Sequence, residues 1–442
     1  YSIGFAPALA PRPVRNHSCF ARSARSSPPA GLNAIVVTSG SVAIREALDQ
    51  ALLQTHTMRH LRKENGRARP PGTKYETPTK KATPTPHACA KMQLSVSYVN
   101  VFLEGRLMKI LVFGTKSYDK ISFEKELKDY PDLQVNFTET NLTPLTATLA
   151  QGYKAVCGFV NSDISAMTLE VLRGLGVELV LMRCAGFDAV NVDFAKSVGM
   201  RVTRVPAYSP EAIAEHAMGL ALCANRRIHK GYIRVRENDF SLEGLVGVTL
   251  HGKTAGILGT GRIGAALCRI CKGFGMKVLG SDLYPNQKLV DEEHVVDEYV
   301  DYDTLYANSD LISLHAFLNK ESYHLIDDES IAKMKDGVIL VNSARGALVD
   351  SNALIRGIRS GKIGAVGLDV YEEENANVYQ DRENQILGSS ITARLCSFPN
   401  VVMTSHQAFF THEALGQIAR ITLDNAEAYA NGKDFIERSV VC

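Results

Sequence analysis

The sequence predicts an α/β protein built from two parallel-sheet domains, and three observations lead to this fold class. First, short apolar runs alternate with helical stretches from Met108 onwards, a pattern typical of parallel strands covered by helices on both faces. Second, the runs form two series, separated by a long helical stretch at 209–228. Third, the second series contains a glycine-rich loop between a strand and a helix, which indicates a dinucleotide-binding domain.

Residues 1–107 lie outside this pattern and are expected to be a transit or disordered leader. They contain 15 Lys and Arg against 5 Asp and Glu, and the first 45 residues hold five arginines and no acid. Such a composition is typical of mitochondrial or plastid transit segments, and the Pro- and Thr-rich stretch 66–87 is typical of a disordered linker. The alternative is that 1–107 is translated leader or misassigned sequence rather than a targeting segment, and that the protein is cytoplasmic.

The first series predicts the strands and helices of one domain. Its apolar runs, bounded by turn signals, predict strands at 109–114, 155–160, 179–186 and 201–206. Helices are predicted between them at 122–130 and 165–176. The helix at 209–228 follows, with Ser209 as N-cap and Pro210 as its first residue. Because its apolar residues cover more than one face, we expect this helix to be buried between two domains or subunits.

The second series carries the strongest motif. Its predicted strands lie at 254–259, 277–282, 310–315, 337–344, 365–371 and 400–405. Directly after the first strand stands G-x-G-x-x-G, formed by Gly259, Gly261 and Gly264. The first glycine permits a tight turn, the second lets the backbone approach a pyrophosphate at the helix N-terminus, and the third allows close helix–strand packing. The residues between them are expected at the cofactor as well: Thr260, Arg262 and Ile263.

The predicted cofactor is NAD. The strand after the glycine loop ends in Asp282, 18 residues beyond Gly264. A carboxylate there can accept hydrogen bonds from the adenosine ribose, and its charge would repel a 2′-phosphate. The structural alternative is a glycine-rich turn followed by a surface aspartate. The order of strand, glycines, helix, strand and acid favours the dinucleotide site.

Three later strands of this series end in polar residues. Arg345 follows the fourth strand, Asp369 and Glu374 close and follow the fifth, and His406 follows the sixth. Ligands of open parallel sheets bind outside the carboxyl ends of the strands. We therefore expect these side chains to meet in one crevice, beside a bound nicotinamide.

These groups suit the reduction of a 2-keto acid. Arginine binds a carboxylate through two parallel hydrogen bonds and fixes the keto carbon. Histidine can donate the proton, and a neighbouring carboxylate favours its imidazolium form. Singly, each residue has a structural explanation: a loop histidine, an arginine paired with Asp350, and a solvated acidic turn. Their joint position downstream of a dinucleotide loop favours catalysis.

From Met108 to about Phe435 the chain resembles the D-isomer-specific 2-hydroxyacid dehydrogenases, most closely their fermentative D-lactate dehydrogenase branch. The motifs that carry the resemblance are RCAGFDAVNVD, VPAYSPEAIAEHA, NRRIHKGYIRVRENDFSLEGL, GKTAGILGTGRIG, VNSARGALVD, GLDVYEEE and SHQAFFTHEAL. The resemblance implies NADH-dependent, reversible reduction of pyruvate to D-lactate. The alternatives are a related enzyme for bulkier 2-keto acids or glyoxylate, and a non-enzymatic NADH-sensing co-regulator.

The resemblance also implies roles for single residues. Arg345 matches the arginine that binds the substrate carboxylate, His406 the catalytic histidine, and Glu374 the carboxylate paired with it. The cofactor residues that it adds are His315, Ala344 and Asp369. The substrate residues that it implies, besides Arg345, are Ala185, Gly186, Tyr208, Phe159 and Phe409. One departure is Phe317, which stands where the family usually has a proline.

By the same resemblance, the cofactor domain is inserted into the other domain. A flavodoxin-like substrate domain would comprise 108–207 and 410–442, and the NAD-binding domain would comprise 208–409. The hinges would lie near Tyr208 and Ala408. The resemblance further implies a homodimer or homotetramer.

Composition argues against nucleic acid and membranes as partners, so a small-molecule substrate is expected. A formal net charge of +2 argues against dedicated binding to nucleic acid or acidic membranes, and no apolar stretch approaches the roughly 18 residues of a membrane helix. Nine thinly spread cysteines fit a reducing compartment. No metal is expected, because Cys268 and Cys271 lack a second pair at zinc spacing. Five other histidines are expected to be structural: His216, His229, His294, His324 and His412.

Overall fold

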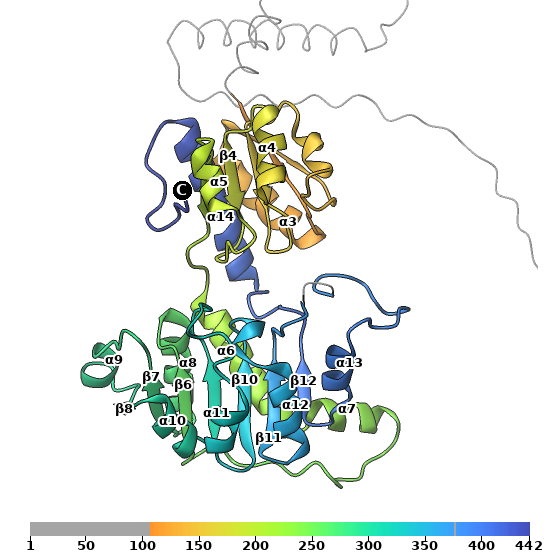
Figure 1. The fold of residues 1–442 in the computed structure, drawn as a ribbon, viewed down its shortest axis with the longest axis vertical. Coiled ribbons are helices and arrows are strands. Elements are labelled where there is room, and N and C mark those ends of the chain that lie inside the picture. Colours follow the sequence, from red (N-terminus) through yellow and green to blue (C-terminus); the bar gives the residue numbers. More distant parts are fainter. Residues whose placement is uncertain (1–106, 375–376) are drawn as a thin grey trace, which may run out of the picture. The chain divides into compact units, whose positions relative to one another are not determined.

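The computed structural model describes residues 107–374 and 377–442. The predicted leader lies outside these residues except for Leu107, so the leader and its organelle stay predictions. The described residues form two parallel β-sheets with helices around them (Figure 1), which confirms the predicted fold class. In the described ranges, no helix has both the length and the apolar character needed to cross a bilayer.

The first sheet has five parallel strands in the order β2-β1-β3-β4-β5. Their bounds are β1 (Met108–Val112), β2 (Leu133–Phe137), β3 (Ala155–Gly158), β4 (Leu179–Met182) and β5 (Arg201–Arg204). This is the flavodoxin-like order, with its switch point between β1 and β3. Strand β2 was not predicted. Only alternate residues of this edge strand, Leu133 and Val135, are buried, so it shows no continuous apolar run.

Helices around the first sheet complete the first domain. They are α3 (Ser117–Glu126), η1 (Leu127–Asp129), η2 (Thr146–Ala150), α4 (Ala166–Gly174), α5 (Val192–Ser197) and, from the far end of the chain, α14 (His412–Ala430). In β1, Leu111 faces one core cluster and Ile110 faces the other. Helix α14 joins both clusters through Ile418 and Leu423. Figure 1 shows it in blue among the yellow elements β4 and α5.

The second sheet has seven parallel strands in the order β12-β11-β10-β9-β6-β7-β8. Their bounds are β6 (Thr254–Leu258), β7 (Lys277–Ser281), β8 (Glu298–Tyr299), β9 (Leu311–Leu314), β10 (Val338–Asn342), β11 (Ile363–Leu368) and β12 (Val401–Met403). The strand order reverses between β6 and β9, and this switch point is where Rossmann folds bind dinucleotides. Strand β8, which is only two residues long, was not predicted.

Helices cover both faces of the second sheet. They are α6 (Pro210–Asn225), α7 (Ile228–Arg236), α8 (Arg262–Gly273), α9 (Lys288–Asp291), α10 (Tyr302–Asn308), α11 (Asp328–Lys333), η3 (Gly346–Leu348), α12 (Ser351–Arg359) and α13 (Ser390–Ser397). Helix α6 buries Ala217, Leu220 and Ala221 in the same core cluster as residues of α8, β10 and β11. Packing within the second domain therefore accounts for the broad apolar surface of this helix.

Two segments connect the two sheets. Residues 205–209 lead from β5 to α6, and residues 404–411 lead from β12 to α14. Ser209 caps α6 by accepting a hydrogen bond from the amide of Ala212. The second segment includes His406 and Phe409, so it supplies site residues as well as a connection.

Candidate active site

A cavity of about 630 Å³ collects most of the predicted site residues. Those that line it are Ala185, Gly186, Tyr208, Gly261, Arg262, Ile263, Gly264, His315, Ala344, Arg345, Asp369, Glu374, His406 and Phe409. A second cavity of about 570 Å³ shares Gly261 and Arg262 with the first, and it adds Thr260 and Asp282. Phe159 lines neither cavity. The residues after β6, β10, β11 and β12 thus meet at one edge of the sheet.

His406 is held beside Glu374 by a hydrogen bond between its ring Nδ1 and Glu374 Oε1, at 3.2 Å. The two residues follow β12 and β11, which are paired neighbours in the sheet. The imidazole is 23% exposed and the carboxylate 14%, so solvent screens the pair only in part. With Nδ1 engaged, Nε2 is the ring nitrogen that remains for proton exchange with a ligand.

The backbone of His406 is in the left-handed region, at φ 50°. Such a conformation costs a non-glycine residue about 1–3 kcal/mol and persists where its surroundings hold it. Asp369 provides that support. Its main-chain oxygen accepts a hydrogen bond from the His406 amide, and its carboxylate accepts from the amides of Gln407 and Ala408, each at 2.8 Å.

The carboxylate of Asp369 is almost fully buried, at 1% exposure. Burial by itself would raise the pKa of Asp369, but hydrogen bonds from His216, Thr404 and the amides of Ala408 and Gln407 outweigh it and lower the pKa. The Asp369 group is therefore an anion near neutral pH. Its carboxylate holds the turn that presents His406 by accepting hydrogen bonds from the amides of Gln407 and Ala408. Asp369 also borders the cavity.

Arg345 projects toward the first domain. A Cβ built on Gly186 would lie 2.8 Å from Arg345 Nη2, so only glycine leaves room for the guanidinium there. Arg345 Nε lies 3.8 Å from Asp188 Oδ2. The structural pairing of Arg345 with Asp350 is not made, because the Asp350 carboxylate caps α12 through the amides of Asn352 and Ala353.

Aromatic side chains form one wall of the cavity. Tyr208 and Phe409 both border it, with ring centroids 6.2 Å apart. Phe159 stands behind this wall, 6.0 Å from the Phe409 ring, and the guanidinium of Arg183 lies over it at 4.6 Å. The structure therefore gives Phe159 a supporting position rather than a lining one.

The glycine loop fits a dinucleotide pyrophosphate. A Cβ on Gly264 would lie 2.0 Å from the main-chain oxygen of Gly259, so this glycine is required for helix–strand packing. A Cβ on Gly261, by contrast, would meet nothing within 4 Å. That open space adjoins the N-terminus of α8, where main-chain amides and the helix dipole favour phosphate. The residues present therefore suit NAD.

Asp282 and His315 flank this loop. Asp282 Oδ2 accepts hydrogen bonds from the amide and hydroxyl of Thr260, and Oδ1 accepts from the amide of Tyr284. A carboxylate has about four acceptor positions, so one position on Oδ1 remains for a ribose hydroxyl. Burial lowers the pKa of His315 to about 4, so its ring is neutral near pH 7.

Two residues near the site were not predicted to lie there. His216 on α6, expected to be structural, lies 3.1 Å from Thr404 Oγ1 and 3.4 Å from Asp369 Oδ1. Tyr379 packs against Phe159, with ring centroids 5.4 Å apart. Each contact joins residues more than 100 positions apart, so no local pattern could have indicated it. Across the described residues, no cluster of three His, Cys, Asp or Glu side chains could hold a metal ion.

Comparison with known proteins identifies relatives over three-quarters of the chain. Residues 218–408 match the family model for the NAD binding domain of D-isomer specific 2-hydroxyacid dehydrogenases. The D-lactate dehydrogenase of Escherichia coli K12 is 46% identical over 326 residues, which is 74% of this chain and 98% of that relative.

Solved structures give the same relationship. The pyruvate reductase of Chlamydomonas reinhardtii is 39% identical with a TM-score of 0.71, over 75% of this chain and 99% of that one. An NAD-complexed D-isomer specific 2-hydroxyacid dehydrogenase from Lactobacillus delbrueckii is 29% identical with a TM-score of 0.64, over 76% of this chain and 100% of that one.

Proposed function

The chain belongs to the D-isomer-specific 2-hydroxyacid dehydrogenases, and from that premise we propose that it reduces pyruvate to D-lactate with NADH, reversibly. Membership in this family makes the protein an NAD-dependent oxidoreductase. The observation that supports the residue roles is that Arg345, Glu374 and His406 border one cavity with the glycine loop.

Arg345 binds the substrate carboxylate in this proposal. A guanidinium presents parallel N–H donors that match the two oxygens of a carboxylate. The segment at Ala185 and Gly186 borders the same cavity next to the Arg345 guanidinium and receives the same carboxylate. A substrate held at both sides keeps its keto carbon in one place, which favours reaction through orientation.

His406 is the proton donor in the direction of reduction. Its imidazolium gives the Nε2 proton to the carbonyl oxygen as that oxygen gains negative charge. Glu374, bonded to Nδ1, keeps the ring in one orientation. When bound, NADH supplies the hydride that adds to the keto carbon. The neutral imidazole then takes a proton from solvent, and in D-lactate oxidation it acts as the base.

The aromatic wall supports a small substrate. Tyr208 and Phe409 stand on the substrate side of the cavity, and Phe159 backs them. In this proposal the two rings contact the substrate side chain, where a methyl group needs less room than a phenyl or branched group. Pyruvate is therefore the favoured 2-keto acid.

The test is NADH oxidation by the purified full chain with pyruvate, phenylpyruvate and glyoxylate, followed by absorbance. We expect the highest kcat/KM with pyruvate. A protein that binds NADH but turns over none of the three acids would contradict the enzymatic proposal. A clear preference for phenylpyruvate would contradict only the choice of pyruvate.

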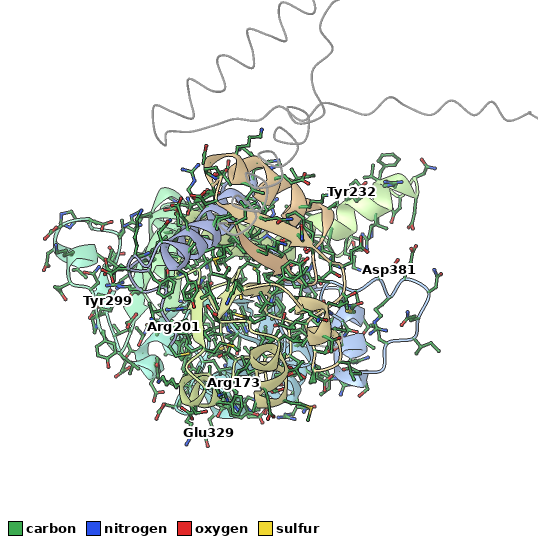
Figure 2. The ribbon with its side chains drawn as sticks, turned by 90° about the horizontal axis from the view of Figure 1, so that it is seen from above. Arg173, Arg201, Tyr232, Tyr299, Glu329 and Asp381 are labelled. Carbon is green, nitrogen blue, oxygen red and sulfur yellow. The ribbon has the colours of Figure 1, made fainter. Side chains whose placement is uncertain are left out.

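We also propose a homodimer through the arm, defined as residues 226–248, which contains α7. Its exposed apolar side chains include Tyr232 at 61%, Phe240 at 72% and Leu242 at 80%, and Figure 2 shows Tyr232 on this segment at the periphery of the molecule. Several exposed apolar side chains on one segment indicate an interaction surface. A second copy of the chain is the partner that the family resemblance favours.

A further inference from the structure

Tyr379 contacts the catalytic histidine of the proposed reaction but has no role in that reaction so far. It follows β11, five residues after Glu374. Its hydroxyl group donates a hydrogen bond to the main-chain oxygen of His406, at 3.0 Å. We propose that Tyr379 is a positioning residue for His406: its hydroxyl group fixes the main chain of His406, and its ring anchors that contact in the first domain.

The backbone conformations support this role. Tyr379 has φ 59° and His406 has φ 50°, so both lie in the left-handed region that bulky residues rarely adopt. Such residues occur at functional sites and need neighbours that hold them. Asp369 holds the amide side of His406, and the Tyr379 hydroxyl group holds its carbonyl side. The peptide groups on both sides of the imidazole are thereby fixed.

The ring of Tyr379 gives this contact a rigid base. It packs against the core cluster of the first domain, with its centroid 5.4 Å from that of Phe159. Phe159 in turn lies under Arg183, a buried guanidinium that donates to the main-chain oxygen of Phe113 at 2.9 Å and contacts Asp119 at 3.3 Å. Tyr379, which follows strand β11 of the second sheet, thus packs against the interior of the first domain.

Burial also keeps the hydroxyl group in its donor form. Burial is the largest of the causes that raise the pKa of Tyr379, and nearby tyrosines and the carboxylates of Asp369 and Glu374 raise it further. The phenol therefore stays protonated throughout the working pH range of an enzyme. The contact to His406 should be constant with pH and should depend on the two domains keeping this arrangement.

The role rests on the proposed function, since it concerns the proton donor of that reaction. Glu374 Oε1 lies 3.2 Å from His406 Nδ1, and a turn of the His406 carbonyl would redirect the side chain away from it. Loss of the Tyr379 hydroxyl group should therefore slow proton and hydride transfer. Cofactor binding at the glycine loop should be unaffected, because that loop follows a different strand.

The experiment compares Tyr379→Phe with wild type in the full chain. We expect kcat with pyruvate to fall about 5- to 10-fold, because poorer positioning of His406 would raise the barrier by about the free energy of one hydrogen bond. The affinity for NADH, measured by fluorescence titration, should stay within twofold. The deuterium isotope effect on kcat, with NADH labelled at the transferred position, should rise because chemistry becomes slower than product release.

Tyr130→Phe is the matched control. It removes a tyrosine hydroxyl group that donates a hydrogen bond to the Asp424 carboxylate at 2.6 Å, and Tyr130 is not among the residues that line the cavity. It should lower Tm and leave kcat and the isotope effect unchanged. If Tyr379→Phe does not fold, Tyr379→Met keeps an apolar side chain without the hydroxyl group and serves the same comparison.

The outcomes separate the two proposals. Wild-type protein that turns over no 2-keto acid contradicts the proposed function itself. Active wild type together with unchanged kcat and an unchanged isotope effect in Tyr379→Phe overturns only the role of Tyr379. Reduced kcat with an isotope effect equal to that of wild type also overturns it, because a general loss of stability would then explain the result.

Discussion

The side chain of His406 is oriented by residues that are far from it in the sequence. Glu374 engages its ring, and Asp369 accepts hydrogen bonds from its amide and from the two amides that follow. Tyr379 donates to its carbonyl oxygen. These contacts place the imidazole without involving the glycine loop. Proton transfer and cofactor binding should therefore be separable by mutation.

Replacing the imidazole tests this separation. His406→Gln should lower kcat with pyruvate by about 10²- to 10⁴-fold, the usual contribution of a general acid, because an amide cannot supply the proton. NADH affinity by fluorescence titration should stay near that of wild type. His412→Gln, at the exposed start of α14, is the control and should keep full activity. Loss of NADH binding in His406→Gln would show that the residue has another role.

Asp369 makes the stability of the turn dependent on pH. Its carboxyl pKa is lowered in the folded protein, so its contribution is present above the ordinary aspartate pKa of about 3.9 and is lost as pH falls through the lowered value. Asp369→Asn should destabilise the fold at pH 7 by about 2–4 kcal/mol. This deficit, measured by denaturant unfolding, should shrink as pH falls below about 4.

A second carboxylate provides the control for Asp369. Asp297 also has a lowered pKa; burial opposes the shift, and hydrogen bonds from the Val278 amide and Lys272 produce it. It lies away from the lining of the cavity. Asp297→Asn should lower stability with little change in kcat, whereas Asp369→Asn should lower both. Equal losses of kcat in the two variants would contradict the role of Asp369 in presenting His406.

At the scale of secondary structure, the cofactor site depends on how closely α8 approaches β6. Gly264, in the first turn of α8, faces the main-chain oxygen of Gly259. Gly273, at the other end of the same helix, has open space where its side chain would stand. Close packing therefore requires glycine at position 264 but not at position 273. Gly273 can serve as the control for a substitution of Gly264 in the same helix.

Alanine should be harmful at Gly264 and tolerated at Gly273. Gly264→Ala should reduce NADH affinity at least tenfold and lower Tm, because its Cβ would lie 2.0 Å from the Gly259 oxygen and α8 would have to move. Gly273→Ala should leave NADH affinity unchanged and should not lower Tm, since alanine is the better helix former. Isothermal titration and thermal unfolding measure both. Unchanged NADH affinity in Gly264→Ala would contradict the assignment of the loop.

At the scale of the whole molecule, residues of two domains border one cavity. Ala185, Gly186 and Tyr208 come from the first domain or its connection, while Arg345 and His406 follow strands of the second. The substrate carboxylate is thus expected to be bound from both sides. Assembly of the site depends on the two domains keeping their positions.

The arm can be tested by changing its exposed apolar residues. Tyr232→Asp combined with Ile233→Asp should convert the proposed dimer into a monomer, because two charges would be buried in the contact. Analytical ultracentrifugation measures the mass. Ile121→Asp changes a side chain of α3 that is 68% exposed and should leave the dimer intact. A monomeric wild type at micromolar concentration would contradict the proposal.

Several parts of the fold and site followed from local sequence pattern alone. The glycine loop, the strands around it and the polar residues at strand ends were predictable because each depends on neighbours within a few positions. In a parallel sheet, the end of a strand also fixes which edge a residue occupies. For that reason Arg345, Glu374 and His406 could be predicted to meet although they are spread over the second half of the chain.

Only the tertiary structure decided what surrounds these residues. The contact of His216 with Asp369, the hydrogen bond from Tyr379 to His406 and the position of Phe159 behind the cavity wall each join distant segments. The edge strand β2 and the two-residue β8 are defined by pairing with a neighbour rather than by their own composition. Sequence pattern determines what a residue can do chemically and which sheet edge it occupies. Packing between distant segments decides which partner it meets, because such contacts leave no periodic trace along the chain.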